Sequence, residues 1–315
     1  MKCLFPISNC VFLIKTASSF SKPLFRLSEL GCRIGFLQPG QITILACLPT
    51  RLLRHLQFVV GSDRAPLIAQ TWSEINDLLQ VHPVSIAIID PSGMAMELEQ
   101  LTVAYPSLPV IAYVPLTTQS FTTITQLAQT GLQHVVLYSH DDDSPRFLSL
   151  IDQVKTSPLT VRVIYALRPK LTRLPLRLAK TVENLFEEPH RYPNAQDLAT
   201  ESTITLVRVH RAFREAGLAT PKKIFIAAKM LKAYSYLGDP AHSVNTVSKK
   251  LGYRHARILS DHSNELFGLN PSRLHTYMSK DQVVEKILAS IDVSPLAAAP
   301  DETRQGSSIA SSGSV

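Results

Sequence analysis

Short apolar runs alternate with stretches of helical spacing between about residues 41 and 156. The runs predicted to be strands cover residues 42–48, 58–60, 84–89, 110–114 and 135–138. The stretches predicted to be helices cover residues 51–57, 65–81, 95–104, 122–130 and 145–154. This alternation predicts an α/β domain, in which a five-stranded parallel sheet carries helices on both faces. The loops at the carboxyl ends of its strands would then form the natural site.

The pattern becomes wholly helical after residue 174 and stays so until about residue 290. Residues 157–175 contain three prolines and several basic residues, so we expect a linker there. It would join the α/β domain, at 41–156, to a helical domain at 176–290. Residues 1–40 lack a clean periodicity, and we expect an unstructured or poorly ordered leader. Residues 291–315 have little to bury, and we expect a disordered tail.

Cysteine usage and the apolar start of the chain bear on the compartment. The four cysteines are Cys3, Cys10, Cys32 and Cys47, and none has CxxC spacing. This argues against a zinc site and a disulfide framework, and it favours the reducing cytoplasm. The apolar stretch at residues 3–14 is too short to cross a bilayer, and no run of 18 apolar residues occurs anywhere. We therefore expect a cytoplasmic protein that does not bind membranes; whether residues 1–40 belong to the mature protein stays open.

The positive charge of the chain is concentrated in one region. The formal net charge is +7, and residues 161–280 contain 20 Lys or Arg against nine Asp or Glu, a net of +11. Residues 1–160 are close to neutral, with ten basic and eleven acidic residues. A localised basic domain attracts polyanions, and duplex DNA is the densest common one. The alternative is a solvated basic surface without a partner.

Within this basic region, two short helices joined by a turn are predicted near residue 200. Asn194 is a suitable N-cap for the first helix, and Thr205 for the second. In the second helix, Val209 and Phe213 are four residues apart and face the core, and Gly217 ends the helix. Basic side chains remain on its open side, as in a helix-turn-helix unit.

The same pattern returns after a longer helix. Residues 221–237 form that helix, which starts at Pro-Lys-Lys and is stopped by Gly-Asp-Pro. Ser243 is then an N-cap, a turn follows, and a further helix covers residues 256–267. Thr205 and Ala256, near the starts of the two predicted recognition helices, are 51 residues apart. The sequence therefore predicts an all-α domain with two helix-turn-helix units joined by a long helix.

Three segments of this region carry a resemblance to a known family. They are LATESTITLVRVHRAFREAG, TPKKIFIAAKMLKAYSYLGDP and SVNTVSKKLGYRHARILSDHSNELFGLNPS. From Gln196 to Arg273 the chain resembles the DNA-binding domain of the AraC/XylS family of transcription factors. The resemblance implies two helix-turn-helix units that present recognition helices to successive major grooves.

The resemblance also implies roles for individual residues. In the first unit it places Val207, His210 and Arg211 toward bases, and Arg208 and Arg214 toward phosphates, with plain solvated surface as the alternative for these two. Thr205, the N-cap, is a further DNA-binding candidate. At the start of the long helix, Lys222 and Lys223 are phosphate contacts or plain surface. In the second unit, Ala256, Arg257, Ser260 and Asp261 fall on base-facing positions. This unit is expected to position the protein through Arg254, His255 and Arg257, or to read few bases.

The second unit departs from the family pattern at three places. The family has an Arg at the position of Asp261, an aromatic residue at Ser263 and a basic residue at Asn264. An Asp that faces DNA repels phosphate, although it can accept a hydrogen bond from cytosine N4. We therefore expect the first unit to dominate affinity. His262 and His275 are expected to be ordinary side chains.

The α/β domain resembles a response-regulator receiver that has lost its phosphorylation machinery. Asp90 stands at the end of the third predicted strand, where a receiver carries its phosphorylated Asp. No acidic pair follows the first strand to hold Mg²⁺, and the hydroxyl residue and the Lys of a receiver are missing at their places. We expect a pseudo-receiver without a metal or cofactor, which serves a homodimer or a protein partner. The acidic run at 141–143 is expected to be a solvated loop and helix start.

Four hypotheses of function follow from these patterns. The leading one is a sequence-specific, double-stranded-DNA-binding transcriptional regulator of the AraC type with a pseudo-receiver. The second is a phosphorylation-controlled response regulator, which would require acyl-phosphate chemistry at Asp90. The third is an enzyme, against which stands the lack of GxSxG, P-loop, GxGxxG and paired-His motifs. The fourth is an interaction protein in which DNA binding has decayed.

Overall fold

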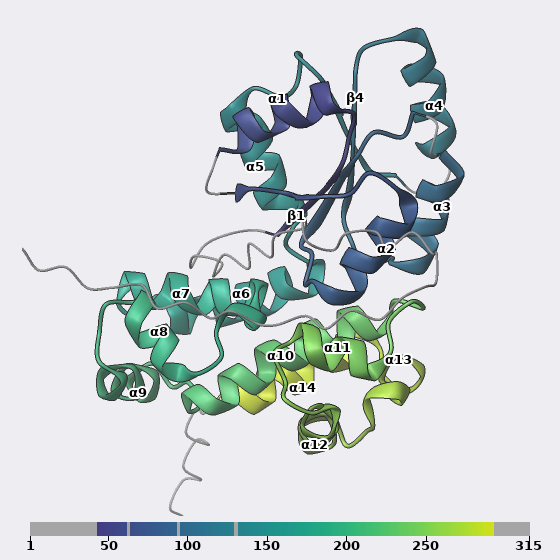
Figure 1. Cartoon of the computed structure of the whole chain (residues 1–315). Coiled ribbons are helices and arrows are strands. Elements are labelled where there is room, and N and C mark those ends of the chain that lie inside the picture. Colours follow the sequence, from purple (N-terminus) through teal and green to yellow (C-terminus); the bar gives the residue numbers. More distant parts are fainter. Residues whose placement is uncertain (1–42, 62–63, 93–94, 129–131, 293–315) are drawn as a thin grey trace, which may run out of the picture. The chain divides into compact units, whose positions relative to one another are not determined.

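The fold is known from a computed structural model, which describes residues 43–292 apart from 62–63, 93–94 and 129–131 (Figure 1). The predicted leader, and the predicted tail beyond residue 292, lie outside the described residues.

The first described part is an α/β domain built on a five-stranded parallel sheet, as predicted. The strands are β1 (Ile44–Cys47), β2 (Leu67–Ile68), β3 (Ile86–Ile89), β4 (Val110–Val114) and β5 (His134–Leu137). Their order is β2-β1-β3-β4-β5, and each neighbouring pair is parallel. This is the order of flavodoxin-like doubly wound sheets.

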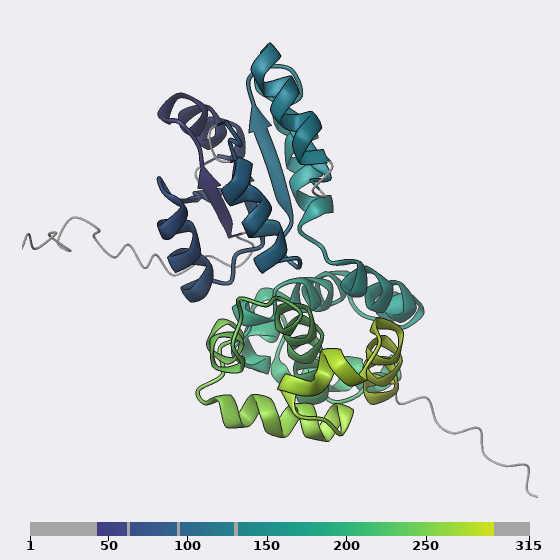
Figure 2. The same cartoon turned by 90° about the vertical axis from the view of Figure 1, so that its right-hand side faces the viewer.

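Helices cover both faces of this sheet (Figures 1 and 2). They are α1 (Thr50–Val60), α2 (Trp72–Val81), α3 (Ala95–Ala104), α4 (Thr118–Ala128) and α5 (Ser144–Val154). Alternate residues of each strand face opposite sides. On β1, Ile44 and Ala46 pack with α1 and α5, whereas Leu45 and Cys47 pack with α2 and α3. Both faces are buried, which explains why the strands are apolar without a break.

The predicted second strand at residues 58–60 is wrong, because these residues form the last turn of α1. Leu52, Leu56 and Val59 are buried on one side of that helix, at helical spacing. A three-residue run of aromatic and β-branched residues is too short to distinguish a strand from a helix end. The second strand is instead Leu67–Ile68, within the stretch predicted to begin a helix at residue 65. That helix begins at Trp72.

The second described part is helical from residue 158 to residue 291. Its helices are α6 (Pro158–Leu171), α7 (Leu176–Glu187), η2 (Pro189–Arg191), α8 (Ala195–Glu201), α9 (Leu206–Glu215), α10 (Pro221–Leu237), α11 (Val244–Lys250), α12 (Ala256–Phe267), η3 (Pro271–Arg273), α13 (Leu274–Tyr277) and α14 (Lys280–Ile291). One apolar core joins them, with α10 in contact with most of the others. No helix in the described ranges is both long and apolar enough to cross a membrane.

The predicted linker at 157–175 is also wrong, because most of it is α6. Ser157 caps this helix by accepting a hydrogen bond from the N–H of Thr160 at 3.3 Å, and Pro158 takes the first helical position. Proline suits that position, since the N–H it lacks would have no partner there. Pro169 lies in the last turn, two residues before the helix ends. Prolines at both ends of a helix therefore gave the appearance of a linker.

Two helix pairs of the same build flank α10 in the sequence. In each, a seven-residue helix is followed by a left-handed residue, Thr203 (φ 56°) in α8–α9 and Gly252 (φ 70°) in α11–α12. The N–H of Ile204 donates to the carbonyl of Ala199 at 3.0 Å, and 49 residues later the N–H of Tyr253 donates to Ser248 at the same distance. This is the hydrogen-bond pattern of a Schellman helix end, and it turns the backbone in the same way in both helix pairs.

Substitutions on α6 will test whether it belongs to the helical core. Val163 is fully buried in that core, whereas Val161 on the same helix is 53% exposed. We expect Val163→Ala to lower the free energy of unfolding by about 2 kcal/mol, because it leaves a cavity. Val161→Ala should change it by less than about 0.5 kcal/mol. Urea denaturation measures both, and equal effects would contradict the packing of α6.

The stability of the helical part should fall in mild acid because of His190. Burial lowers the pKa of His190 to about 4; Glu188 raises it, and nearby cations such as Lys232 lower it further. The unfolded chain binds this proton near pH 6.5 and the folded chain only near pH 4, so the free energy of unfolding decreases between these values. This decrease in the free energy of unfolding amounts to about 3 kcal/mol, and His190→Gln should remove it. The exposed His210 provides the control, since His210→Gln should leave the pH profile unchanged.

Candidate nucleic-acid interface

Helix α9 has one buried and one exposed side. The hydroxyl of Thr205 caps its first turn by accepting a hydrogen bond from the N–H of Arg208 at 3.3 Å. Val209, Ala212 and Phe213 are buried in the helical core, as the four-residue spacing predicted for Val209 and Phe213. Because these residues fix the rotation of the helix, the side chains between them must face outward.

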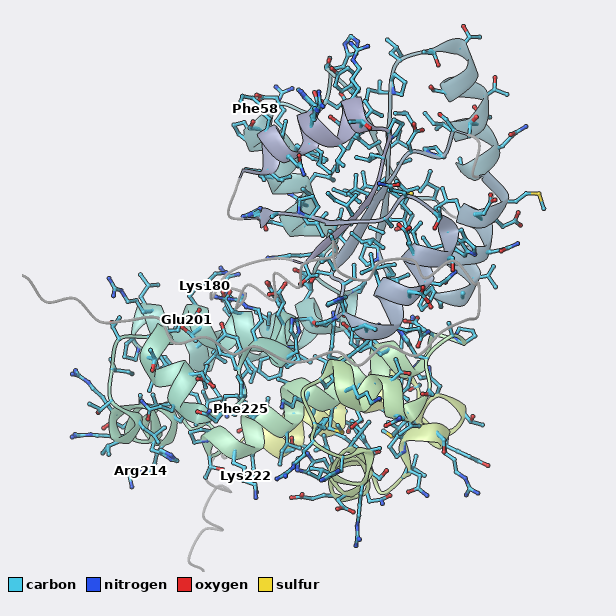
Figure 3. The ribbon with its side chains drawn as sticks, in the orientation of Figure 1. Phe58, Lys180, Glu201, Arg214, Lys222 and Phe225 are labelled. Carbon is cyan, nitrogen blue, oxygen red and sulfur yellow. The ribbon has the colours of Figure 1, made fainter. Side chains whose placement is uncertain are left out.

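The exposed side of α9 carries all the residues predicted for its DNA face. They are Thr205, Val207, Arg208, His210, Arg211 and Arg214 (Figure 3 labels Arg214). Val207 is 79% exposed, which is unusual for an apolar side chain at a helix start. Three arginines, one histidine and a valine thus share a surface that is open to solvent. Such a surface could contact both phosphates and base edges.

One of the three arginines has an acidic neighbour on the same helix. The Nε atom of Arg211 lies 2.7 Å from Oε1 of Glu215, one turn further along. Both side chains are exposed, so this pair contributes little to stability. It does raise the pKa of Arg211, through the hydrogen bond and charge of Glu215, and it orients the guanidinium along the helix.

A further arginine, which the sequence patterns did not single out, contacts the turn before α9. Arg177, on α7, donates from Nη1 to the hydroxyl of Thr203 at 3.0 Å. Thr203 is the left-handed residue of that turn, a conformation that is costly for a residue with a Cβ atom. The hydrogen bond holds its side chain while the backbone is in this conformation. The two residues are 26 positions apart, so no local pattern could have indicated the contact.

The start of α10 adds two lysines to the exposed basic residues. Pro221 occupies the first helical position and is buried, whereas Lys222 and Lys223 are exposed, as expected (Figure 3 labels Lys222). Lys222 is also close enough to α12 to influence the pKa of His262. Burial is the largest cause of the lowered pKa of His262, which Glu265 raises and Lys222 lowers.

Helix α12, the counterpart of α9, presents mixed charge. Arg254, His255 and Arg257 are exposed, as predicted, but so is Asp261. Ser260 is only partly exposed, and its hydroxyl donates to the carbonyl of Ala256 within the helix at 3.3 Å. The second exposed face is therefore less basic than that of α9, and one of its predicted contact residues is engaged within the helix.

Ser263, where the resemblance led us to expect an aromatic residue, lies in the core of the helical part. Ser263 is fully buried, and its hydroxyl donates to the carbonyl of Leu269 at 2.6 Å. Leu259 and Phe267 lie in the core on either side, as predicted. This hydrogen bond ties the end of α12 to the chain that follows. The ring of His275 stacks on that of Tyr234.

Asp90 stands at the carboxyl end of β3, as predicted. Its side chain is 8% exposed, and Oδ1 accepts a hydrogen bond from the N–H of Ser92 at 2.9 Å. After β1 the chain continues as Leu48-Pro49-Thr50, without an acid. Among the described residues no group of three His, Cys, Asp or Glu side chains lies close enough to hold a metal ion.

The acidic run at 141–143 is not solvated throughout, so that prediction is wrong for its middle residue. Asp142 is buried; its Oδ2 accepts a hydrogen bond from the Tyr113 hydroxyl at 2.5 Å and lies 2.8 Å from His55 Nε2. Burial raises the pKa of Asp142, but these groups and two backbone hydrogen bonds outweigh it and lower the pKa overall. Asp141 and Asp143 are exposed, as expected. Asp142 thus joins β4 to α1.

Comparison with known proteins adds nothing to this geometry: no protein-family model, no curated protein and no solved structure matches the chain.

The cap of α9 makes a prediction about stability that does not depend on any partner. Thr205→Ala removes the acceptor for the Arg208 N–H, so we expect the free energy of unfolding to fall by about 1 kcal/mol. Thr205→Ser keeps a hydroxyl and should restore most of it. Thermal or urea denaturation of the two variants decides the matter, and an equal loss in both would show that the hydroxyl is not a cap.

Proposed function

We propose that this protein is a sequence-specific DNA-binding transcriptional regulator of the AraC type. In this proposal α8–α9 and α11–α12 are two helix-turn-helix units, α10 joins them, and α9 and α12 are their recognition helices. The observation that carries the proposal is the exposed basic side of α9, which brings together the residues of the first unit predicted for base and phosphate contacts.

The repeated backbone of the two helix pairs supports the same proposal. A recognition helix has to be held at a fixed angle to the helix before it, so that its first turns reach the major groove. The hydrogen bonds of the two turns match one for one at a spacing of 49 residues. Both second helices bury an apolar residue in their first half, Val209 in α9 and Leu259 in α12, and expose the residues around it.

Each exposed residue of α9 suits a particular part of the DNA surface. The Arg211 guanidinium can make a bidentate contact with guanine O6 and N7, and the Val207 methyl groups can pack against a thymine methyl. Arg208 and Arg214, with Lys222 and Lys223, are suited to phosphate contacts, which supply affinity without sequence information. The first unit would therefore combine both kinds of contact.

The second unit would contribute less to affinity than the first. Asp261 and Glu265 are exposed on α12 and repel phosphates, and the hydroxyl of Ser260 is engaged within the helix. Arg254, His255 and Arg257 remain free to contact the backbone. This unit would then mainly position the protein along the duplex.

We also propose that the α/β domain is a pseudo-receiver, an input or assembly domain that serves a homodimer or a protein partner. Its support is the strand order β2-β1-β3-β4-β5 together with Asp90 at the carboxyl end of β3. Phosphoryl transfer to Asp90 would need a cation to balance the charge, and the residues after β1 supply no acid to bind one. A role in assembly needs none of that chemistry.

Binding to duplexes selected from a random library will test the DNA-binding proposal. Arg211→Ala should abolish the preference for a guanine at one position, at a cost of about 1–3 kcal/mol in discrimination. Arg162→Ala is the matched control, since this exposed arginine on α6 pairs with Asp281 and is not part of α9. Lys222→Ala should weaken binding equally for all sequences and reduce the salt dependence by about one phosphate contact.

The proposal fails if the wild-type protein selects no sequence. It also fails if the α9 and α6 variants bind with the same preference and the same dependence on salt.

A further inference from the structure

The loop between α10 and α11 (residues 238–243) is bound by the α/β domain. Ser107, which precedes β4, donates from its N–H to Oδ1 of Asp239 at 2.8 Å and from its hydroxyl to Oδ2 at 2.5 Å. The N–H of Ala241 donates to the carbonyl of Ala104, at the end of α3, at 3.3 Å. A segment without regular structure is thus held by three hydrogen bonds from residues more than 130 positions earlier.

Gln80, near the end of α2, continues this contact onto α11 itself. Its Nε2 donates to the carbonyl of Ala241 at 3.0 Å, and its Oε1 accepts a hydrogen bond from the hydroxyl of Thr246 at 3.3 Å. Its Nε2 also lies 3.0 Å from the hydroxyl of Tyr105. One side chain of the α/β domain therefore bonds both the loop and the first turn of α11.

The loop is also the centre of a buried polar network within the helical part. Asp239 is 2% exposed and lies 3.2 Å from Nδ1 of His242. His242 Nε2 lies 2.7 Å from Nζ of Lys250, the last residue of α11, which is itself 4% exposed. The His242 ring meets Tyr105 of the α/β domain edge to face. The network thus runs from Ser107 through Asp239 and His242 to the far end of α11.

A buried carboxylate has to be hydrogen-bonded, because its desolvation is otherwise costly. Asp239 receives two of its hydrogen bonds from Ser107, and His242 is its other neighbour. If Ser107 loses its hydroxyl, the carboxylate keeps fewer partners, and the loop it anchors is less firmly held. Since α11 has only seven residues, its direction depends on how the chain leaves this loop.

We propose that Ser107 and Gln80 are positioning residues for the second helix pair. By holding the loop and the first turn of α11, the α/β domain fixes the direction of α11 and, through it, of α12. This inference rests on the proposed function, since it makes the α/β domain control how α12 meets DNA.

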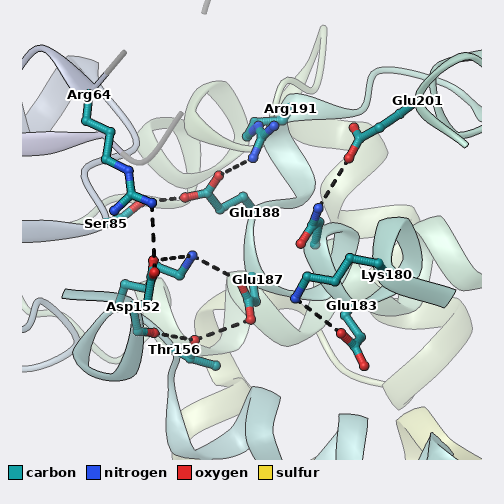
Figure 4. Close-up of polar contacts among 12 residues, drawn as sticks. Arg64, Ser85, Asp152, Thr156, Lys180, Glu183, Glu187, Glu188, Arg191 and Glu201 are labelled. Atoms are coloured by element: carbon teal, nitrogen blue, oxygen red, sulfur yellow. Dashed lines mark hydrogen bonds and ion pairs between the residues drawn. The ribbon is translucent and has the colours of Figure 1, made fainter. Parts of the chain in front are cut away.

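A second junction between the two parts serves as an internal control. There, the Ser85 hydroxyl donates to Oε1 of Glu188 at 3.1 Å, and Arg191 holds the other oxygen of Glu188 at 2.8 Å (Figure 4). Lys155 Nζ lies 3.3 Å from Oε2 of Glu187 in the same junction. These contacts reach the end of α7 and η2 and do not involve α11.

Hydrogen exchange of the full chain without DNA tests the positioning directly. In Ser107→Ala, we expect the amides of α11 and α12 to exchange about tenfold faster, while those of α8 and α9 keep their rates. Gln80→Ala should act in the same direction. Ser85→Ala removes an interdomain hydrogen bond of the other junction and should leave α11 and α12 unchanged. If the Ser107 and Ser85 variants change the same amides, or if the Ser107 variant changes none, the proposal is overturned.

Footprinting on a selected duplex then tests the consequence for DNA. The wild type should protect two successive grooves, and Ser107→Ala should lose protection of one groove while it keeps the other. Equal protection of both grooves by this variant would overturn the inference and leave the proposed function intact. If the wild type protects no groove, the proposed function fails, and the exchange experiment still decides whether Ser107 positions α11.

Discussion

The helical part of the molecule depends on the burial of α10. Its buried residues include Ile224, Phe225, Met230 and Ala233, which point to different sides of the helix and not along one stripe. A helix that is apolar all round has to be enclosed by neighbours, and here it contacts both helix pairs as well as α7 and α14. Since neither α8–α9 nor α11–α12 is long enough to be stable alone, each is held in place by its contact with this one helix.

Much of this architecture could be predicted from the sequence, because it is encoded by local periodicity. Four of the five strands, and the helices from α8 to α12, lie where apolar spacing and N-caps such as Asn194 and Ser243 placed them. The errors arose where a local signal was ambiguous. Residues 58–60 are β-branched and aromatic yet end a helix, and the prolines of 157–175 sit at helix positions that tolerate them.

The candidate site likewise has features that could be predicted from the sequence and contacts that could not. The exposed face of α9 follows from helical spacing once the core residues are fixed, so its arginines could be named from the sequence. The contacts of Arg177 with Thr203, of Ser263 with Leu269 and of Asp142 with Tyr113 could not, because none of these pairs forms part of a sequence repeat or motif. Ser107 and Asp239 are 132 positions apart, and only the folded chain brings them together.

The two helix pairs share a backbone but differ in charge, and this has a geometric consequence. A protein with two equal DNA-binding helix pairs could bind a site in either direction, whereas one basic pair and one pair of mixed charge are not interchangeable. If both helix pairs bind DNA as proposed, the base sequence is strongly constrained at one end of the site and loosely constrained at the other. The protein then lies on the site in a single polarity. A regulator of this kind needs no palindrome, and one copy already distinguishes upstream from downstream.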